Sequence, residues 1–377
     1  MRTDELFSII DFGSYKFRIG IFANYLPNSK FISEITYQQN TENIIYQENQ
    51  LKKIIVKTEK EIGKHLKNIN VMIDDKDCIS LDLSIKKHID KNKLNKNLIK
   101  TFIQEAKLLI ENNYLNYKIQ HLIINKYILD EVVFYELPAE SISNELVLEI
   151  KFLLIPKSII LNVQKTLKKN HIIVDNFFNT SYIKSLNYNK YYAEYKSKVF
   201  LDIGLNKTSI FFYNSNNLIY SKFIPIGGNH VTKDISKLLN YDLQESENIK
   251  LQLKQNNLTF LNDESSKDLL IKIVHARIEE IIDLSFKDFD FISLIKETKS
   301  ILVFSGEGSK LLSKKSIYLK EEYNHFDDMS FFEENSSLIC DSAFNYDRSD
   351  ISNEVVIVPK RQQKTGLFEK LFYLFSN

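Results

Sequence analysis

Two stretches far apart in the chain share one pattern, and this repeat constrains the fold more than any other feature. Residues 6–22, LFSIIDFGSYKFRIGIF, and residues 198–213, KVFLDIGLNKTSIFFY, each combine an apolar strand, a sharp turn and a second strand of alternating character. Asp11 and Asp202 hold equivalent places in the two units. The repeat predicts two related α/β halves, each of which opens with a β-hairpin.

The tips of both hairpins suit phosphate and metal binding. Gly13 and Gly204 allow backbone N–H groups to approach an anion closely, and Ser14 adds a hydroxyl donor. A single tip of this kind also forms for turn reasons alone, because hairpin turns favour Asp and Gly. Two tips that face each other across a cleft predict a phosphate clamp, with Asp11 and Asp202 holding Mg²⁺ directly or through water.

Glycine is scarce in this chain, and its positions are therefore informative. There are nine glycines in 377 residues, whereas glycine makes up about 7% of average proteins. Most of them follow apolar, strand-like runs directly. We interpret these as positions where another residue would not fit: Gly13, Gly204, Gly227, Gly228, Gly306 and Gly308.

Two further glycine clusters extend the predicted anion site. Residues 223–239 form a strand, a Gly-Gly-Asn turn and a helical pattern, so an anion at that helix N-terminus would meet unpaired N–H groups. Residues 300–312 form a buried-type strand, a glycine turn and another helix start. Between them, Glu247 and Lys250 lie three residues apart on one face of a predicted helix, a spacing also typical of a surface ion pair.

Composition and charge exclude several classes of protein. Apolar residues make up 44% of the chain and charged residues 26%, which is typical of a globular protein and not of a disordered one. The net charge of +1 gives no reason to expect a nucleic-acid partner. Cys78 and Cys340 have no metal or redox spacing and are predicted to be buried free thiols in a reducing compartment. Neither a secretory signal nor a membrane-spanning segment is predicted.

The last residues are unexpectedly apolar. In KTGLFEKLFYLF (364–375), a helical arrangement brings the large apolar side chains within an arc of roughly 160°, namely Leu367, Phe368, Leu371, Phe372, Leu374 and Phe375. Lys370, together with the basic residues just before the helix, favours an anionic lipid surface. We predict a membrane-targeting amphipathic helix at 364–377 behind a flexible linker at 348–363; the alternative is a helix that docks on its own protein.

The order of these motifs resembles the actin/Hsp70/sugar-kinase superfamily. Within it, the chain resembles the FtsA family, bacterial actin homologues that tether the tubulin-like protein FtsZ to the membrane. PIGGNHVTKDI is similar to the family's second-half stretch, SGEGSKL to its adenosine-binding turn, and the tail to its membrane-targeting sequence. The resemblance covers nearly the whole chain and is most specific over residues 199–312 and at the tail.

The resemblance implies an α/β fold of duplicated ribonuclease-H-type domains around a nucleotide cleft. FtsA-like proteins carry an inserted α+β subdomain, 1C, in place of actin's usual small subdomain; here the patterns predict helices at 93–113 and 157–170 and strands at 118–130 and 145–156. The implied subdomains are 1A at 1–79 and 160–190, 1C at 80–159, 2A at 191–229 and 301–347 with its last helix packing back toward 1A, and 2B at 230–300.

The resemblance also assigns residues to an ATP and Mg²⁺ site. The first phosphate loop would comprise Asp11, Gly13 and Ser14, and the second Asp202, Gly204, Lys207 and Thr208. The phosphate side would be lined by Gly227, Gly228 and Asn229, the ribose met by Glu247 and Lys250, and the adenine by Gly306, Glu307, Gly308 and Ser309. The second loop reads Gly-Leu-Asn-Lys-Thr where the family has further glycines, and Glu307 replaces a small residue.

ATP is expected to be a structural ligand or slow switch with weak turnover, not the substrate of a metabolic enzyme. Hydrolysis in this superfamily needs a group that positions water on the crossing after the inserted module. Asp175 and Asn176 are the early candidates in that stretch, and the same pair could cap a helix. His65, His121, His171 and His230 are interpreted as core or surface residues.

The implied function is that of a cell-division scaffold. Such a protein would self-assemble through 1C and neighbouring subdomains, receive the C-terminal peptide of FtsZ on 2B, recruit later division proteins and bind anionic lipids. It would act peripherally on the cytoplasmic face of the inner membrane at the septum. The alternatives are a PilM-like cytosolic adaptor of a pilus machine, which needs no terminal membrane helix, and a small-molecule kinase of the same superfamily.

Overall fold

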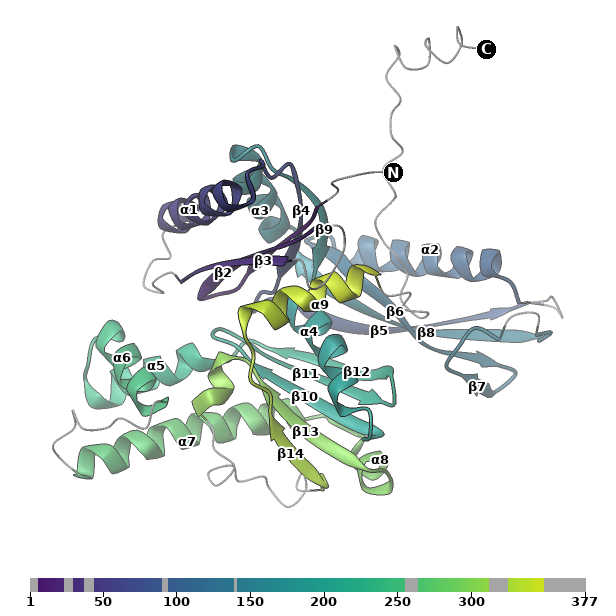
Figure 1. Ribbon diagram of the computed structural model, residues 1–377. Coiled ribbons are helices and arrows are strands. Elements are labelled where there is room, and N and C mark those ends of the chain that lie inside the picture. Colours follow the sequence, from purple (N-terminus) through teal and green to yellow (C-terminus); the bar gives the residue numbers. More distant parts are fainter. Residues whose placement is uncertain are drawn as a thin grey trace, which may run out of the picture.

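Three β-sheets and the helices around them form the architecture of the computed structural model (Figure 1). The structure describes residues 6–23, 30–36, 44–89, 94–138, 141–254, 264–311 and 325–348. The linker from residue 349 and the predicted membrane helix at 364–377 lie outside the described residues. Among the described residues, none of the helices has the length and apolar content needed to cross a membrane.

The first sheet has the strand order β3-β2-β1-β4-β9. Its first three strands are antiparallel neighbours, whereas β4 and β9 run parallel to β1. Helices α1 and α3 pack on one face, and α9 packs on the other. The elements are β1 (Phe7–Phe12), β2 (Lys16–Phe22), β3 (Lys30–Thr36), α1 (Ile44–Ile62), β4 (Asn68–Ile73), α3 (Lys157–Lys169), β9 (Ile173–Phe178) and α9 (Ser336–Arg348).

The second sheet repeats this topology. In the order β12-β11-β10-β13-β14, the first three strands are antiparallel neighbours, and β13 and β14 run parallel to β10. The duplication predicted from the two hairpins is therefore present. The elements are α4 (Thr180–Asn189), β10 (Ser197–Ile203), β11 (Thr208–Asn214), β12 (Asn217–Ile224), α5 (Gly228–Leu239), α6 (Leu243–Lys254), α7 (Glu264–Phe286), α8 (Ile292–Glu297), β13 (Ser300–Ser305) and β14 (Asp328–Phe331), with a 3₁₀ turn at Glu307–Leu311.

The apolar runs of both hairpins follow from burial on two faces. In β10, Val199 and Leu201 face the cluster formed with α5 and α7, whereas Phe200 faces the cluster formed with α4. A strand covered on both faces needs apolar side chains at every position instead of at alternate ones. This requirement explains the consecutive apolar residues at Ile9 and Ile10 of β1 and at 199–201 of β10.

The third sheet is an antiparallel module inserted between β4 and β9. Its strand order is β5-β8-β6-β7, and α2 covers one face through a separate apolar cluster. The helix predicted at 93–113 and the strands predicted at 118–130 and 145–156 are present. The elements are β5 (Ile79–His88), α2 (Lys96–Asn113), β6 (Tyr117–Leu129), β7 (Val132–Phe134) and β8 (Glu145–Pro156).

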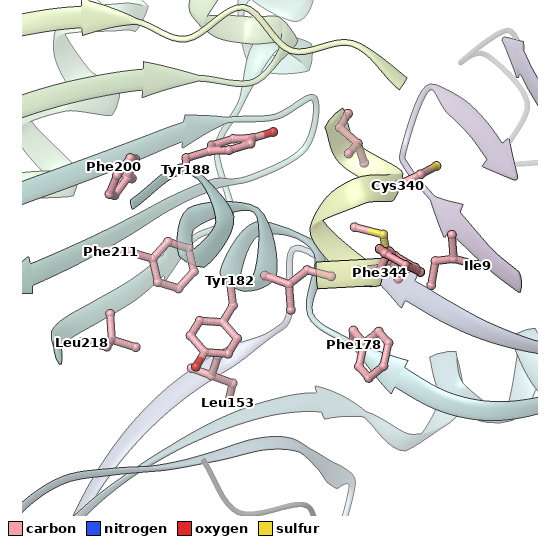
Figure 2. Close-up of a cluster of buried hydrophobic side chains, with 14 of the residues drawn as sticks. Ile9, Leu153, Phe178, Tyr182, Tyr188, Phe200, Phe211, Leu218, Cys340 and Phe344 are labelled. Carbon is pink, nitrogen blue, oxygen red and sulfur yellow. The ribbon is translucent and has the colours of Figure 1, made fainter. Parts of the chain in front are cut away.

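Helices α4 and α9 pack against each other between the two larger sheets and share one core with both. Figure 2 shows Tyr182 of α4 and Phe344 of α9 in this cluster, together with side chains from all three sheets. Phe344 stacks on Phe22 of the first sheet with a centroid separation of 4.3 Å. Cys340 lies in the same core, and Cys78 is also free and buried, as predicted. The shared core fixes the relative position of the two hairpins.

Candidate nucleotide cleft

Two adjoining cavities lie where the hairpin tips of the two large sheets meet. The first measures about 120 Å³ and is lined by residues of both tips. The second measures about 60 Å³ and shares Tyr15, Gly204, Leu205 and Glu307 with the first. Predicted residues that line at least one cavity are Asp11, Gly13, Ser14, Asp202, Gly204, Lys207, Gly228, Glu247, Lys250, Gly306, Glu307 and Gly308.

Four predicted residues line neither of these cavities. The Thr208 hydroxyl donates to the carbonyl of Ile226 at 2.8 Å, which ties β11 to the end of β12. The Ser309 hydroxyl donates to the carbonyl of Gly306 at 2.7 Å. The other two are Gly227 and Asn229. These residues shape the loops behind the cavities.

Gly306 is required by the close approach of two strands. Its φ is +84°, and a Cβ there would lie 2.4 Å from Oδ1 of Asp202 and 2.5 Å from the carbonyl oxygen of Ile203. A side chain would therefore be strained in conformation and would also strike β10. The glycine brings the turn after β13 directly against the second predicted metal-binding carboxylate.

The expectation of unpaired N–H groups at the α5 N-terminus is wrong. The N–H of Gly228 donates to the carbonyl of Gly204 at 2.9 Å, and that of Asn229 donates to the carbonyl of Leu205 at 2.7 Å. A Cβ at Gly227 would lie 2.6 Å from the Gly204 oxygen, so glycine is what allows this approach. The second hairpin loop itself thus caps the helix that was expected to bind an anion.

The carboxylate of Asp11 is paired with an arginine that the site prediction did not include. Arg18 donates from Nη1 to Oδ2 of Asp11 at 2.6 Å, and the Asp11 side chain is 1% exposed. Burial raises the pKa of Asp11, and the Arg18 charge and hydrogen bond oppose this rise. The two residues stand opposite each other in the β1–β2 register, so the hairpin pairing was the available sequence signal.

The carboxylate of Asp202 is paired with a buried lysine of α4. Nζ of Lys184 lies 3.0 Å from Asp202 and 2.8 Å from Glu334, which precedes α9. Burial alone would lower the pKa of Lys184, but the two carboxylates raise it above its usual range. Lys184 is therefore a fixed cation that joins α4 to β10 and to the segment before α9. Neither Lys184 nor Glu334 was predicted, because no local sequence pattern connects them to Asp202.

Lys207 links the second hairpin to the first sheet. From the second hairpin, its Nζ lies 3.1 Å from Oδ2 of Asp74, which follows β4, and donates to the hydroxyl of Ser181 at 2.9 Å. The ammonium also lies 4.4 Å from the ring centre of Phe223, within cation–π range. Lys207 was predicted to contact phosphate, and here it faces the first cavity.

These pairings bear on which ligands the cleft can hold. Asp11 and Asp202 each already hold a cation of the chain, and within the described ranges no group of three or more His, Cys, Asp or Glu is placed to hold a metal ion. The arrangement therefore does not fit Mg²⁺ at these carboxylates. Among the described residues, the same cavity is lined by four cations, Lys16, Arg18, Lys184 and Lys207, and by five carboxylates, Asp11, Asp74, Asp202, Glu307 and Glu334. The cations are the groups that would meet phosphate oxygens, and each would exchange its carboxylate partner to do so.

Size sets a second condition on the ligand. Small-molecule pockets usually measure about 300–1,000 Å³, whereas the two cavities measure about 120 and 60 Å³. The donor set suits a phosphate-bearing ligand, but a whole nucleotide enters only if the two sheets move apart at the cleft.

Glu247 and Lys250 of α6 do not form a surface pair, so that interpretation is wrong. Lys250 is buried, and its Nζ donates to Oε2 of Glu247 at 2.6 Å, to the hydroxyl of Thr232 at 2.8 Å and to the carbonyl of Gly228 at 3.1 Å. These bonds tie α6 to the start of α5 beside the second cavity. The ribose contact implied by the resemblance stays a prediction.

The candidate hydrolytic residues lie away from the cavities. Asp175 and Asn176 are within β9 and bond to β4: Asn176 donates to Asn70 at 2.8 Å, and Asn68 donates to Asp175 at 3.0 Å. Neither caps a helix. The N-cap of α4 is Asn179, whose Oδ1 accepts from the N–H of Tyr182 at 3.1 Å.

Comparisons with known proteins agree with the topology. The family model for the cell division protein FtsA matches residues 199–283, from β10 into α7. Over 103 residues the chain is 30% identical to FtsA of Bacillus subtilis (strain 168), covering 22% of each protein. It is 25% identical over 233 residues to FtsA of Buchnera aphidicola subsp. Baizongia pistaciae (strain Bp), covering 58% of this chain and 53% of that protein.

A solved structure is similar over most of the chain. A chain of a PilM–PilN type IV pilus biogenesis complex superposes with a TM-score of 0.62 at 12% identity and covers 88% of this chain and 89% of its own. The fold is actin-like. The predicted mixed α/β fold class is confirmed, and residues 199–283 are FtsA-like in sequence. The chain spans about half or less of the length of the FtsA relatives named above.

Proposed function

We propose that this protein is an FtsA-like scaffold of cell division, which self-assembles and links FtsZ to the membrane. The observation that carries the proposal is the FtsA family match over residues 199–283. This stretch contains the second hairpin with its loop, the helix that the loop caps, and most of the helical layer outside the second sheet. It is the part of the chain where the cleft and the proposed partner surface adjoin.

The proposed partner surface for FtsZ lies on helices α5 to α7. Several large apolar side chains there are exposed: Leu238, Leu243, Leu269 and Ile271. Exposed apolar side chains grouped on neighbouring helices suit the docking of a short, partly apolar peptide. The C-terminal peptide of FtsZ is the partner that the FtsA resemblance implies for this region, 230–300.

The proposed ligand of the cleft is an adenine nucleotide. Arg18, Lys184 and Lys207 would meet its phosphates, and the cavity beside Glu247 and Gly308 would receive its nucleoside. The candidate water-positioning residues Asp175 and Asn176 bond to β4 and line neither cavity. We expect the nucleotide to act as a structural ligand or slow switch, with turnover well below the enzyme median of about 10 s⁻¹.

Membrane attachment is proposed through the apolar arc at 367–375. A single short helix buries part of each side chain and must order itself, so one tail is expected to bind weakly and assembly to add avidity. Protein ending at Thr365 is expected to lose co-sedimentation with anionic liposomes, and full-length Phe372→Glu should behave like it. Undiminished binding by the truncated protein would contradict the tail's role.

A PilM-like adaptor is the second candidate, because the PilM–PilN structure is similar over most of both chains. The deciding experiment is the localisation of a fluorescently tagged protein in dividing cells. A mid-cell ring that disappears when FtsZ is depleted is expected for the division scaffold. Foci that persist without FtsZ and coincide with a pilus machine would favour the adaptor.

A further inference from the structure

The outer face of the first sheet carries a concentration of positive charge. Helices α1 and α3 lie side by side there (Figure 1), and we call residues 47–67 and 157–171 the α1–α3 surface. It contains ten lysines and three glutamates, a net charge of +7, whereas the whole chain has +1. The rest of the chain therefore sums to −6. The lysines are exposed: Lys52, Lys53, Lys57, Lys60, Lys64, Lys67, Lys157, Lys165, Lys168 and Lys169.

Two of the three acids of this surface are partly buried and paired, whereas Glu61 is exposed, so the lysines still dominate the outside. Glu48 accepts two hydrogen bonds from Lys169 at 2.8 and 3.0 Å and so links the two helices. Glu59 is 19% exposed, accepts from the N–H of Leu66 at 2.9 Å and lies 3.2 Å from His65. A groove of about 770 Å³ runs between α1 and α3 over these pairs.

Apolar side chains stand exposed among the lysines. Val56 of α1 is 40% exposed, and Leu161 of α3 is 62% exposed. Leu161 lies one turn from both Lys157 and Lys165, so these three side chains share a helix face. Long lysine side chains reach outward past neighbouring apolar groups, an arrangement that suits a membrane interface.

The residue types favour a lipid surface over other polyanions. The α1–α3 surface contains no Arg, Phe, Tyr or Trp. Arginine supplies the bidentate contacts typical of phosphopeptide and base recognition, and aromatic side chains supply the stacking typical of single-stranded nucleic acid. Lysines that have neither arginines nor aromatic residues beside them act as point charges, which suits diffuse attraction toward an anionic membrane. This attraction is worth about 1 kcal/mol per lysine near the surface.

The end of α9 leaves enough chain for both contacts at once. Helix α9 packs on the opposite face of the same sheet and ends at Arg348. The 18 residues from there to Gly366 can span up to about 60 Å when extended. A packed helix or sheet layer is about 10 Å thick, so the sheet and the α1–α3 layer together lie well within this span, and residues 367–375 can reach a membrane that the α1–α3 surface faces.

We propose that the α1–α3 surface is a second membrane-contacting site, which holds this face of the protein against anionic lipid. The proposal rests on the proposed membrane role of the protein and adds to it an orientation that the tail alone does not supply. The tail provides apolar insertion, and the lysines provide a salt-sensitive electrostatic contact.

The test compares two charge reversals of equal size in the full-length protein. The first is Lys53→Glu/Lys57→Glu/Lys168→Glu on the α1–α3 surface. The matched control is Lys233→Glu/Lys237→Glu/Lys272→Glu on α5 and α7, where the lysines are also exposed. Co-sedimentation is measured with phosphatidylglycerol-containing and with purely phosphatidylcholine liposomes at low and high salt, after thermal melts verify that both variants fold.

The first variant should lose about tenfold or more in partition onto anionic liposomes at low salt, and the control should stay near wild type. Equal losses in both variants, or no loss in the first, would overturn the proposal. The proposal would also be overturned if the first variant lost binding to polyglutamate or duplex DNA but kept its binding to liposomes. Protein ending at Thr365 separates the two proposals. If it binds anionic liposomes like wild type while the first variant does not, the role of the tail is contradicted and that of the α1–α3 surface is supported.

Discussion

At the residue scale, a few buried cations control the cleft. Lys184 is 6% exposed and lies between two carboxylates that belong to different parts of the second half. Buried charges of this kind are tolerated only when they are paired. Each partner therefore depends on the others, and the cleft residues form one electrostatic unit.

Lys184→Met should destabilise the protein by about 3 kcal/mol or more, because it leaves Asp202 and Glu334 buried without their shared cation. Chemical denaturation measures the free energy of unfolding. Lys237→Met serves as the control, since Lys237 is exposed on α5 and should change stability by no more than about 0.5 kcal/mol. Similar small effects in both variants would contradict the assigned role.

His230 should make stability fall in mild acid. Its Nδ1 accepts from the N–H of Gly227 at 3.2 Å, and burial, then the Lys233 and Arg277 charges, lower the pKa of the imidazole. A lowered folded-state pKa adds stability above the unfolded value of about 6.5, and this is lost as pH falls. The Tm of the wild type should drop more between about pH 7.5 and about pH 5.5 than that of His230→Gln. Parallel pH profiles for the two proteins would rule this out.

At the element scale, the start of α4 joins the inserted module to the cleft. A bulge in β6 at Gln120 interrupts the register with β8 and re-aims neighbouring side chains. Gln120 accepts from Asn179 at 3.3 Å, and Nε2 of His121 accepts from the Asn179 N–H at 2.8 Å. The following residue pair, Thr180 and Ser181, contacts Asp11 and Asp74 of the cleft.

Asn179→Ala should cost about 1–2 kcal/mol in unfolding free energy through loss of the α4 cap, and should also weaken nucleotide binding. Asn95→Ala is the matched control, because Asn95 caps α2 in the inserted module by accepting from Asn97 and Leu98. The control should lose similar stability without a change in nucleotide affinity. Affinity measured with a fluorescent ATP analogue decides the matter, and equal affinities for both variants would argue against the link.

At the scale of the whole molecule, protein cations stand at the positions where Mg²⁺ was expected: Arg18 beside Asp11 and Lys184 beside Asp202. Lys207 crosses the cleft to Asp74. An adenine nucleotide that enters this cleft therefore meets a counter-charge supplied by the chain. At the proposed nucleotide site, phosphate binding would then be separate from metal binding.

Nucleotide affinity should accordingly be nearly the same with Mg²⁺ and with a chelator. Binding of a fluorescent ATP analogue measures this, and Gly306→Asp is the non-binding reference because its side chain would collide with Asp202. A nucleotide affinity that rises about tenfold or more with Mg²⁺, a gain of about 1.4 kcal/mol, would contradict this prediction. It would show that Mg²⁺ displaces Arg18 or Lys184 from the carboxylates.

The sequence by itself determined the duplicated hairpins, the glycine turns and about half of the residues that line the cleft, because strand periodicity and turn chemistry are local properties. The sequence could also have predicted Arg18, because Arg18 stands opposite Asp11 in the hairpin register. Only the tertiary structure brought Asp74, Lys184 and Glu334 to the same cleft, from a strand end, a helix and a loop far apart in the chain. Helix α4 looks polar in sequence, yet nearly all of it is buried. Which polar side chains are buried, and which charge neutralises which, depends on how the sheets pack, and no local pattern encodes that.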